Sequence, residues 1–227
     1  MDVHDLGFGR PHAVARRLAG RPAIRFSSAS PRQDPTAGYT ALELMLAGVI
    51  LSLVVAAGAP ALVGAKHDIQ AGGAVTYLAA VMRQARIEAA RRHVSVAVRV
   101  VPNSEGAWEF QLFVDGDGDG VRTDDIEAGI DPPKDRAVGL AQLYPGVDFR
   151  ILPGVRPVVP GETLADGDPV RLGRANLMSC TPLGGCSGGS VYLAGPGRRQ
   201  MVVRVLGGTG RVRSGRYAWE RGTWVIR

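Results

Sequence analysis

An alternating acidic segment is the first group of residues in this sequence whose spacing suits chemistry. Asp115, Asp117 and Asp119 alternate with glycines, and Glu127 follows a short distance later. Carboxylates at alternate positions before a turn glycine are typical of a calcium loop, because their oxygens can converge on one hard cation. The EF-hand spacing places its bidentate glutamate at loop position twelve, which here is Ile126, so Glu127 comes one place late. The segment predicts either a calcium site formed by these four acids or a hairpin turn of residues that tolerate left-handed backbone.

Arginines gather near the C-terminus and suggest a second kind of chemistry. From Gly195 onward every cation is an arginine, and Glu220 is the single acid. Guanidinium groups such as those of Arg211, Arg213 and Arg216 suit bidentate contacts with phosphates better than ammonium groups do. DNA contacts of this sort are independent of base sequence and weaken strongly with salt. Two alternatives stay open: arginine is the dominant cation of the whole chain, and charges also protect exposed strand edges.

A segment that resembles a nucleophile elbow runs from Gly185 to Gly189, with Ser187 at its centre. That pattern requires a strand-turn-helix setting and a histidine later in the chain. The last histidine is His93, which precedes the segment. We therefore predict no catalytic residue, no required cofactor and no enzymatic activity.

A long apolar run is the element that must position these groups. The sequence contains no charge between Glu43 and Lys66. A helix from Leu44 to Ala65 spans about 33 Å, enough to cross the hydrocarbon core of a bilayer. A carboxylate at the mouth of such a helix is costly and usually functional. The run predicts a transmembrane helix over residues 39–65. An ordinary signal anchor has similar length and flanking charges, but it does not require a carboxylate at the position of Glu43.

The segment from Gly38 to Met45 resembles the type IV pilin and pseudopilin signature. The resemblance implies that a prepilin peptidase cuts after Gly38 and methylates the amine of Tyr39, which makes Glu43 the fifth residue of the mature chain. It also implies that Glu43 pairs with the N-terminal amine of a neighbouring subunit, so that assembly neutralises two charges in a poor dielectric. Pro60 falls where many pilins carry a helix-kinking proline.

The chain continues as an amphipathic helix after the apolar run. Its apolar positions recur at steps of three and four, which predicts one face packed on a sheet: Val75, Leu78, Met82, Ala85 and Ala89. The stretch from Ala85 to Ala90 is similar to the Ala-Arg-x-Glu-Ala pattern of the GspH/FimT subfamily, although a solvated helix edge explains its charges equally well. Gly210 to Arg213 is similar to the Gly-Arg-x-Arg pattern with which FimT-like minor pilins bind DNA.

Strands are predicted beyond this helix. Residues 95–101 and 108–114 alternate between apolar and polar types on either side of a turn, which predicts a hairpin. The later strand candidates are 147–152, 190–193, 201–206 and 217–226. The sequence thus predicts an α+β fold, in which a long N-terminal helix, transmembrane in its first half and amphipathic in its second, packs on antiparallel β-sheet.

Three segments describe the predicted domain organisation. Residues 1–38 form a cleaved prepilin leader whose arginines outnumber its acids, so it stays in the cytoplasm. Residues 39–65 form the transmembrane and filament-core helix, and residues 66–227 form an exported pseudopilin domain. Cys180 and Cys186 are the only cysteines. An exported domain lies in an oxidising space, so a disulfide that closes a short loop is the leading interpretation.

The resemblance implies a minor pseudopilin, a structural subunit of the pseudopilus of a type II secretion system. One alternative is a FimT-type minor pilin that acts in type IV pilus assembly or DNA uptake. A second is a membrane-anchored adhesion module that binds calcium. The expected location is the bacterial inner membrane, crossed once, with the C-terminal domain in the periplasm. The expected partners are other pilins or pseudopilins, the prepilin peptidase, the inner-membrane assembly platform and, in the FimT alternative, DNA.

Overall fold

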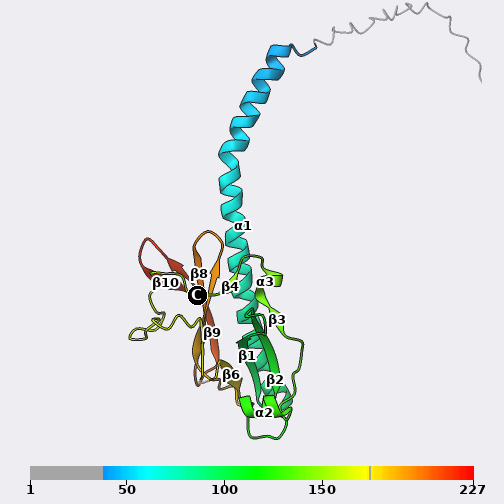
Figure 1. The fold of residues 1–227 in the computed structure, drawn as a ribbon, viewed down its shortest axis with the longest axis vertical. Coiled ribbons are helices and arrows are strands. Elements are labelled where there is room, and N and C mark those ends of the chain that lie inside the picture. The colour runs from blue at the N-terminus through cyan, green and yellow to red at the C-terminus, as the bar shows by residue number, and fades with distance from the viewer. Residues whose placement is uncertain (1–37, 174) are drawn as a thin grey trace, which may run out of the picture. The chain divides into compact units, whose positions relative to one another are not determined.

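The computed structural model describes residues 38–173 and 175–227 (Figure 1). The predicted leader, apart from Gly38, lies outside the described residues. The chain divides into two compact units between Ala47 and Gly48. One element, the helix α1, crosses this boundary.

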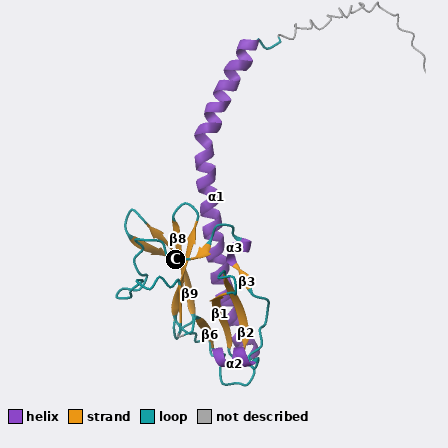
Figure 2. Ribbon diagram, in the orientation of Figure 1, coloured by secondary structure: helices purple, strands orange, loops and turns teal. Residues whose placement is uncertain are grey.

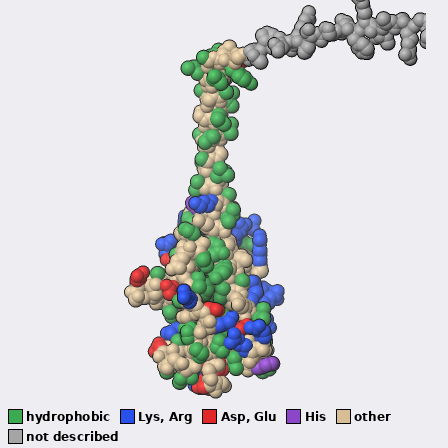
Figure 3. All heavy atoms as spheres, turned by 90° about the vertical axis from the view of Figure 1, so that its right-hand side faces the viewer, with side chains coloured by type: hydrophobic (Ala, Val, Ile, Leu, Met, Phe, Trp, Pro, Cys, Tyr) green, Lys and Arg blue, Asp and Glu red, His purple; other side chains and the backbone are tan. Residues whose placement is uncertain are grey.

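Helix α1 runs without interruption from Ala41 to Arg92 and contains Pro60. Its large apolar side chains from Leu42 to Val63 are exposed, and Figure 3 shows them along the N-terminal part of the helix. By length and composition this part of α1 can cross a membrane. From Ala71 onward the same helix buries one face. A single helix therefore has two environments, and the change occurs soon after the first lysine that follows the apolar run.

Two antiparallel sheets lie beside the C-terminal part of α1 (Figure 2). The first has the order β3-β2-β1-β6, with bounds β1 Val96–Pro102, β2 Trp108–Val114, β3 Val138–Gly139 and β6 Leu177–Cys180. The second has the order β10-β9-β8-β7-β4, and β5 also pairs with β7; the bounds are β4 Asp148–Phe149, β5 Val170–Leu172, β7 Gly189–Gly195, β8 Arg199–Leu206, β9 Arg211–Ala218 and β10 Thr223–Ile226. Two short helices, α2 (Thr123–Ala128) and α3 (Leu140–Leu143), lie in the connections.

The core confirms the predicted stripe on α1. Val75, Leu78, Met82, Ala85 and Ala89 are all buried, and they pack with valines and other apolar residues from both sheets. The inner face of the second sheet contributes alternate residues such as Val203 and Val205, as the pleat of a strand requires. The predicted α+β architecture is therefore present, and α1 is part of the core of the domain.

The predicted strand positions were correct in part. The hairpin of β1 and β2 matches the predicted ranges closely, and its turn is closed by Asn103, whose side-chain oxygen accepts hydrogen bonds from the amides of Glu105 and Ala107. The prediction of one strand over 217–226 was wrong. A turn at 219–222 separates β9 from β10, because Gly222 has a left-handed φ of 59° that permits the reversal.

Candidate functional site

The predicted residues Gly38, Tyr39 and Glu43 all lie at or just before the start of α1. Thr40 and Glu43 cap the helix reciprocally: Glu43 Oε2 accepts hydrogen bonds from Thr40 N at 2.9 Å and Thr40 Oγ1 at 3.0 Å, and Thr40 Oγ1 accepts one from Glu43 N at 3.2 Å. This is a capping box, which satisfies two amide donors that a helix start leaves without partners. Tyr39 is 81% exposed, and no atom lies within 4 Å of a side chain built on Gly38. The peptide bond between Gly38 and Tyr39 is therefore not enclosed by other described residues.

The acidic loop gathers three of its four predicted ligands. Carboxylate oxygens of Asp115, Asp117 and Asp119 lie within 4.8 Å of one another. Glu127 does not join them, because its carboxylate lies 3.3 Å from Arg99 Nη2. The sequence pattern gave no indication of this ion pair, since the two residues are far apart along the chain.

Backbone amides already occupy part of this carboxylate cluster. Asp115 accepts hydrogen bonds from Gly118 N at 2.7 Å and Gly120 N at 3.0 Å. Buried Asp131, which the sequence analysis did not identify, accepts bonds from Gly116 N and Arg122 N, both at 3.0 Å. These contacts define the shape of the loop. Calcium takes six to eight oxygen ligands, so the three aspartates would supply only part of such a set.

The disulfide between Cys180 and Cys186 closes a small loop after β6. Within it, Thr181 N donates to Gly185 O at 2.8 Å and Gly184 N donates to Thr181 O at 2.9 Å. Arg86 on α1 donates from Nε to Gly184 O at 3.0 Å, so the loop is also tied to the helix. The segment that resembles a nucleophile elbow leads into strand β7 instead of a helix, which is the wrong setting for that motif.

The structure separates the three C-terminal arginines between two faces of the second sheet. Arg213 lies opposite Arg204 in the register of β8 and β9, on the face away from α1. Arg211 lies on this same outer face, opposite Leu206. Arg216 lies opposite Met201, on the inner face. It lines a groove of about 390 Å³ beside α1.

A row of polar side chains crosses the outer face of this sheet. Ser190 is opposite Arg204, and Arg171 is opposite Ser190, so four strands contribute Arg171, Ser190, Arg204 and Arg213 in one line. Like charges directly opposite each other are destabilising, which applies to Arg204 and Arg213. No carboxylate among residues 38–173 and 175–227 forms an ion pair with either of them. Arg171, by contrast, is paired with Asp166. We call these four residues the basic row; an anion placed between Arg204 and Arg213 would relieve their repulsion.

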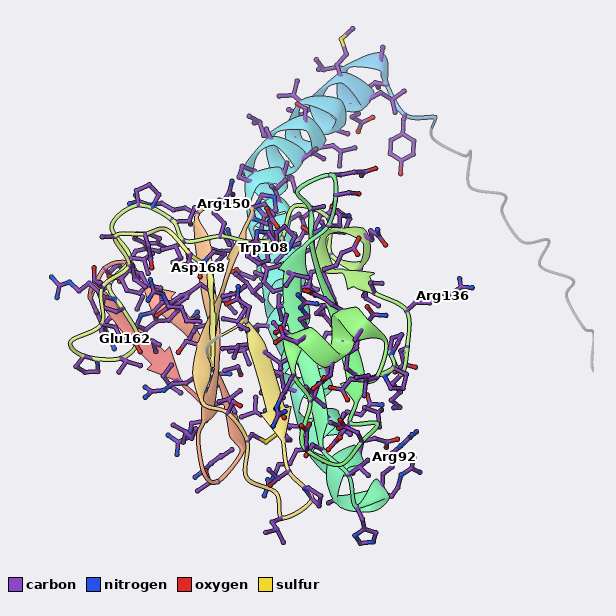
Figure 4. The ribbon with its side chains drawn as sticks, turned by 60° about the horizontal axis from the view of Figure 1, so that its bottom comes forward. Arg92, Trp108, Arg136, Arg150, Glu162 and Asp168 are labelled. Atoms are coloured by element: carbon purple, nitrogen blue, oxygen red, sulfur yellow. A yellow bond between two sulfur atoms is a disulfide. The ribbon has the colours of Figure 1, made fainter. Side chains whose placement is uncertain are left out.

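The segment from Arg150 to Asp168 covers the rest of the outer face. Leu152 N donates to Gln200 Oε1 at 2.8 Å, and Val158 N donates to Tyr192 Oη at 3.1 Å. Figure 4 labels Arg150, Glu162 and Asp168 on this segment. A hollow of about 430 Å³ stays open beside the basic row, and Glu162 lines it together with Arg171, Ser190 and Arg204. The acidic residue gives the hollow one negative charge among its cations.

Glu88 is the charged residue that sequence reasoning misjudged most. One interpretation of the sequence placed Glu88 on a solvated helix edge, but its side chain is buried, with 5% of the residue exposed. Its Oε1 accepts hydrogen bonds from Arg92 Nε at 2.7 Å and Arg91 Nη2 at 3.0 Å, and Lys134 Nζ lies 3.6 Å away. The hydrogen bonds from the two arginines lower the pKa of Glu88 to about 2. The spacing to Arg91 and Arg92 was visible in the sequence, whereas Lys134 comes from a distant connection.

We expect the Glu88 ion cluster to stabilise the fold near neutral pH and to lose this contribution in acid. Because the pKa of Glu88 is lower in the folded protein than the ordinary value of about 4.3, its contribution is present above that ordinary value and is lost as pH falls toward 2. Glu88→Gln should therefore lower the urea midpoint at about pH 6 more than at about pH 3. Exposed Glu105→Gln is the matched control and should leave the midpoint unchanged at both values. A constant difference between Glu88→Gln and wild type across this range would contradict the assignment.

No protein-family model, curated protein or solved structure matches this chain. Its class therefore follows from the architecture alone. A long N-terminal helix, apolar and exposed at its start and packed on antiparallel sheet over its second half, is a type IV pilin-like architecture.

Proposed function

We propose that this protein is a minor pseudopilin of the GspH/FimT type, a structural subunit of a type II secretion pseudopilus. One observation carries the proposal: a single uninterrupted helix, Ala41–Arg92, is apolar and exposed before the domain and forms part of the core within it. An ordinary membrane anchor does not need to continue into the core of the domain that it holds. A subunit that packs by its helix into a filament does, because the helix must transmit its position to the domain.

The predicted residues take defined roles in this proposal. A prepilin peptidase cuts after Gly38 and methylates Tyr39, and Glu43 then pairs with the amine of a neighbouring subunit. The chain crosses the bacterial inner membrane once, with its domain in the periplasm. Its partners are other pseudopilins and the inner-membrane assembly platform. In this proposal the chain itself has no catalytic role and requires no cofactor.

Mass analysis of the N-terminus tests the proposal. Full-length protein is isolated from membranes with and without an active prepilin peptidase, alongside the Gly38→Ala variant. We expect a peptidase-dependent mature chain that begins at methylated Tyr39, and no cleavage of the variant. Since a side chain at position 38 meets no other atom within 4 Å, loss of cleavage would report the recognition by the peptidase and not a folding defect. An identical uncut chain in every sample would overturn the proposal.

The basic row favours a second candidate, a FimT-type minor pilin that binds DNA. Arg211, Arg213 and Arg216 were the predicted contacts; Arg204 and Arg171 share the outer face with the first two, although Arg171 is paired with Asp166. Neighbouring strands lie about 4.8 Å apart, so the row presents its guanidinium groups along a line that a phosphate backbone can follow. Arg216 lies on the other face and is not part of this surface.

Salt dependence of DNA binding distinguishes the arginines. If the basic row contacts phosphates, Arg204→Ala and Arg213→Ala should each reduce the slope of log affinity against log salt by about 0.9. Arg216→Ala should leave the slope unchanged. Arg136→Ala is the control for net charge, because that side chain extends away from the fold on an unrelated connection (Figure 4). Equal effects of all four substitutions in a binding titration would show non-specific attraction to a basic protein and would exclude the row as the site.

The third candidate, a calcium-binding adhesion module, has less support. Asp115 is occupied by two backbone amides, Asp119 is paired with Arg122, and Glu127 is paired with Arg99. These contacts favour a structural role for the acidic loop. Calorimetric titration with calcium tests this directly: binding that Asp117→Asn removes and Glu127→Gln does not would establish a site formed by the three aspartates.

A further inference from the structure

Two hairpin turns lie at the end of the domain where the apolar run of α1 finishes. The first joins β7 to β8 through Pro196–Arg198, and the second joins β9 to β10 through Trp219–Gly222. Arg199, the first residue of β8, donates from Nη2 to Gly64 O at 2.9 Å and pairs with Asp68. Gly64 belongs to the apolar run, so the first turn is held directly against the last part of that run.

The second turn lies beside the first. The register of β8 and β9 places Arg216 opposite Met201, which brings the end of β9 next to the start of β8. Trp219 confirms this proximity, because its Nε1 donates to Arg198 O at 2.7 Å. The guanidinium carbon of Arg198 also lies 4.2 Å from the centroid of the Trp219 ring. The two turns therefore form one surface.

This surface has the composition of a membrane interface. Arg198, Arg221 and Lys66 are exposed, and Trp219 is partly exposed. Tryptophan is enriched where lipid headgroups begin, and long cationic side chains cover apolar surface while their charges reach the phosphates. The acids at this end include Asp68, which Arg199 neutralises, Glu220, and Asp148 on β4, which lies opposite Ala194 near the first turn. The three exposed cations therefore outnumber the two acids, Asp148 and Glu220, that Arg199 does not neutralise.

The position along α1 agrees with the headgroup layer. That layer is about 5 to 8 Å thick on each side of the hydrocarbon core. Asp68 is three residues beyond Ala65, a rise of about 4.5 Å along a helix. If the apolar run fills the hydrocarbon core, Arg199 and the two turns lie at the depth of the lipid phosphates.

We propose that the turns Pro196–Arg198 and Trp219–Gly222, together with Lys66, form a surface that binds the headgroups of anionic phospholipids. Arg198, Arg221 and Lys66 contact lipid phosphates, and Trp219 lies at the boundary with the acyl chains. The contact fixes the orientation of the domain on the membrane before assembly. This inference rests on the membrane anchoring in the proposed function, but it is independent of cleavage, of the secretion system and of DNA binding.

Hydrogen exchange of the full-length protein in nanodiscs tests the surface. The nanodiscs contain either phosphatidylcholine alone or phosphatidylcholine with phosphatidylglycerol. We expect slower amide exchange at 197–198 and 219–222 only when phosphatidylglycerol is present. The double variant Arg198→Gln, Arg221→Gln should lose this protection, because each arginine removed lowers the equilibrium constant for docking about fivefold. The double variant Arg211→Gln, Arg213→Gln is the control of equal charge and should retain it.

The outcomes separate this inference from the proposed function. If the amides from 48 to 63 are protected in both lipids and the two turns exchange equally in both, the membrane anchor is retained. The proposed lipid-binding surface is then overturned. Loss of protection in both double variants would show attraction of net charge and would also overturn it. Unprotected amides from 48 to 63 would overturn the membrane anchor itself and this inference with it.

Discussion

Replacing Leu78 by alanine should destabilise the folded domain by about 2 to 5 kcal/mol, the range for deleting a fully buried leucine side chain. Leu78 has no exposed surface and lies on the face of α1 that packs against the core residues of both sheets. The cost includes the lost burial of apolar atoms and the cavity left behind, because close-packed neighbours relax only in part. Urea denaturation of the full-length protein in detergent, followed by tryptophan fluorescence, measures the difference.

Leu183 provides a matched control for this experiment. It is 99% exposed in the disulfide loop, so Leu183→Ala makes the same chemical change with no buried contact to lose. We expect its effect to stay within about 0.5 kcal/mol. Similar losses at both positions would contradict the placement of α1 in the core, and with it the observation that carries the proposed function.

Replacing Glu43 by glutamine should abolish incorporation of the subunit into filaments while leaving the helix start intact. Glutamine can accept the hydrogen bond from Thr40 N as glutamate does, so the capping box persists. What disappears is the negative charge that is proposed to neutralise the amine of a neighbouring subunit. We expect normal cleavage after Gly38 and no recovery of the variant with sheared filaments.

Thr40→Ala makes the complementary change at the same helix start. It removes the hydroxyl that accepts from Glu43 N, at a cost of about 1 kcal/mol to the helix start, and it keeps the carboxylate. We expect this variant to enter filaments. If Thr40→Ala fails to assemble and Glu43→Gln assembles normally, the local cap and not the charge is the function of Glu43.

The elements that the sequence predicted well depend on local periodicity. The buried stripe on α1 and the hairpin of β1 and β2 were correct because spacings of three and four, or of two, report directly on a helix face or a strand face. The prediction over 217–226 failed because apolar and aromatic residues on both sides of the reversal were joined into one strand, although Glu220, Arg221 and Gly222 interrupt the pattern and Gly222 has a left-handed φ.

The candidate sites depend on contacts between residues of different elements, and the sequence alone could not predict these contacts. Arg213 was predicted, but its neighbour Arg204 becomes apparent only through the register of two strands. Glu127, on helix α2, looked like a ligand until its contact with Arg99 on strand β1 was known. Glu88 looked solvated until Lys134 was placed beside it. Arg99 and Lys134 are remote along the chain from their partners, and Arg204 meets Arg213 only through the register of one hairpin, so the fold brings these side chains together.

The packing of α1 against the last strands also has a consequence for biogenesis. The stripe from Val75 to Ala89 shares one core with Val203, Val205 and Val212, which are translated more than a hundred residues later. If the domain is exported as proposed, the core cannot close until β8 and β9 have crossed the membrane. During export, the helix stripe stays open to solvent, and contacts of such high sequence separation form slowly. In the proposed export to the periplasm, a chain stalled before β8 emerges would thus present an uncovered apolar helix, which makes it a natural client for chaperones and a target for proteases.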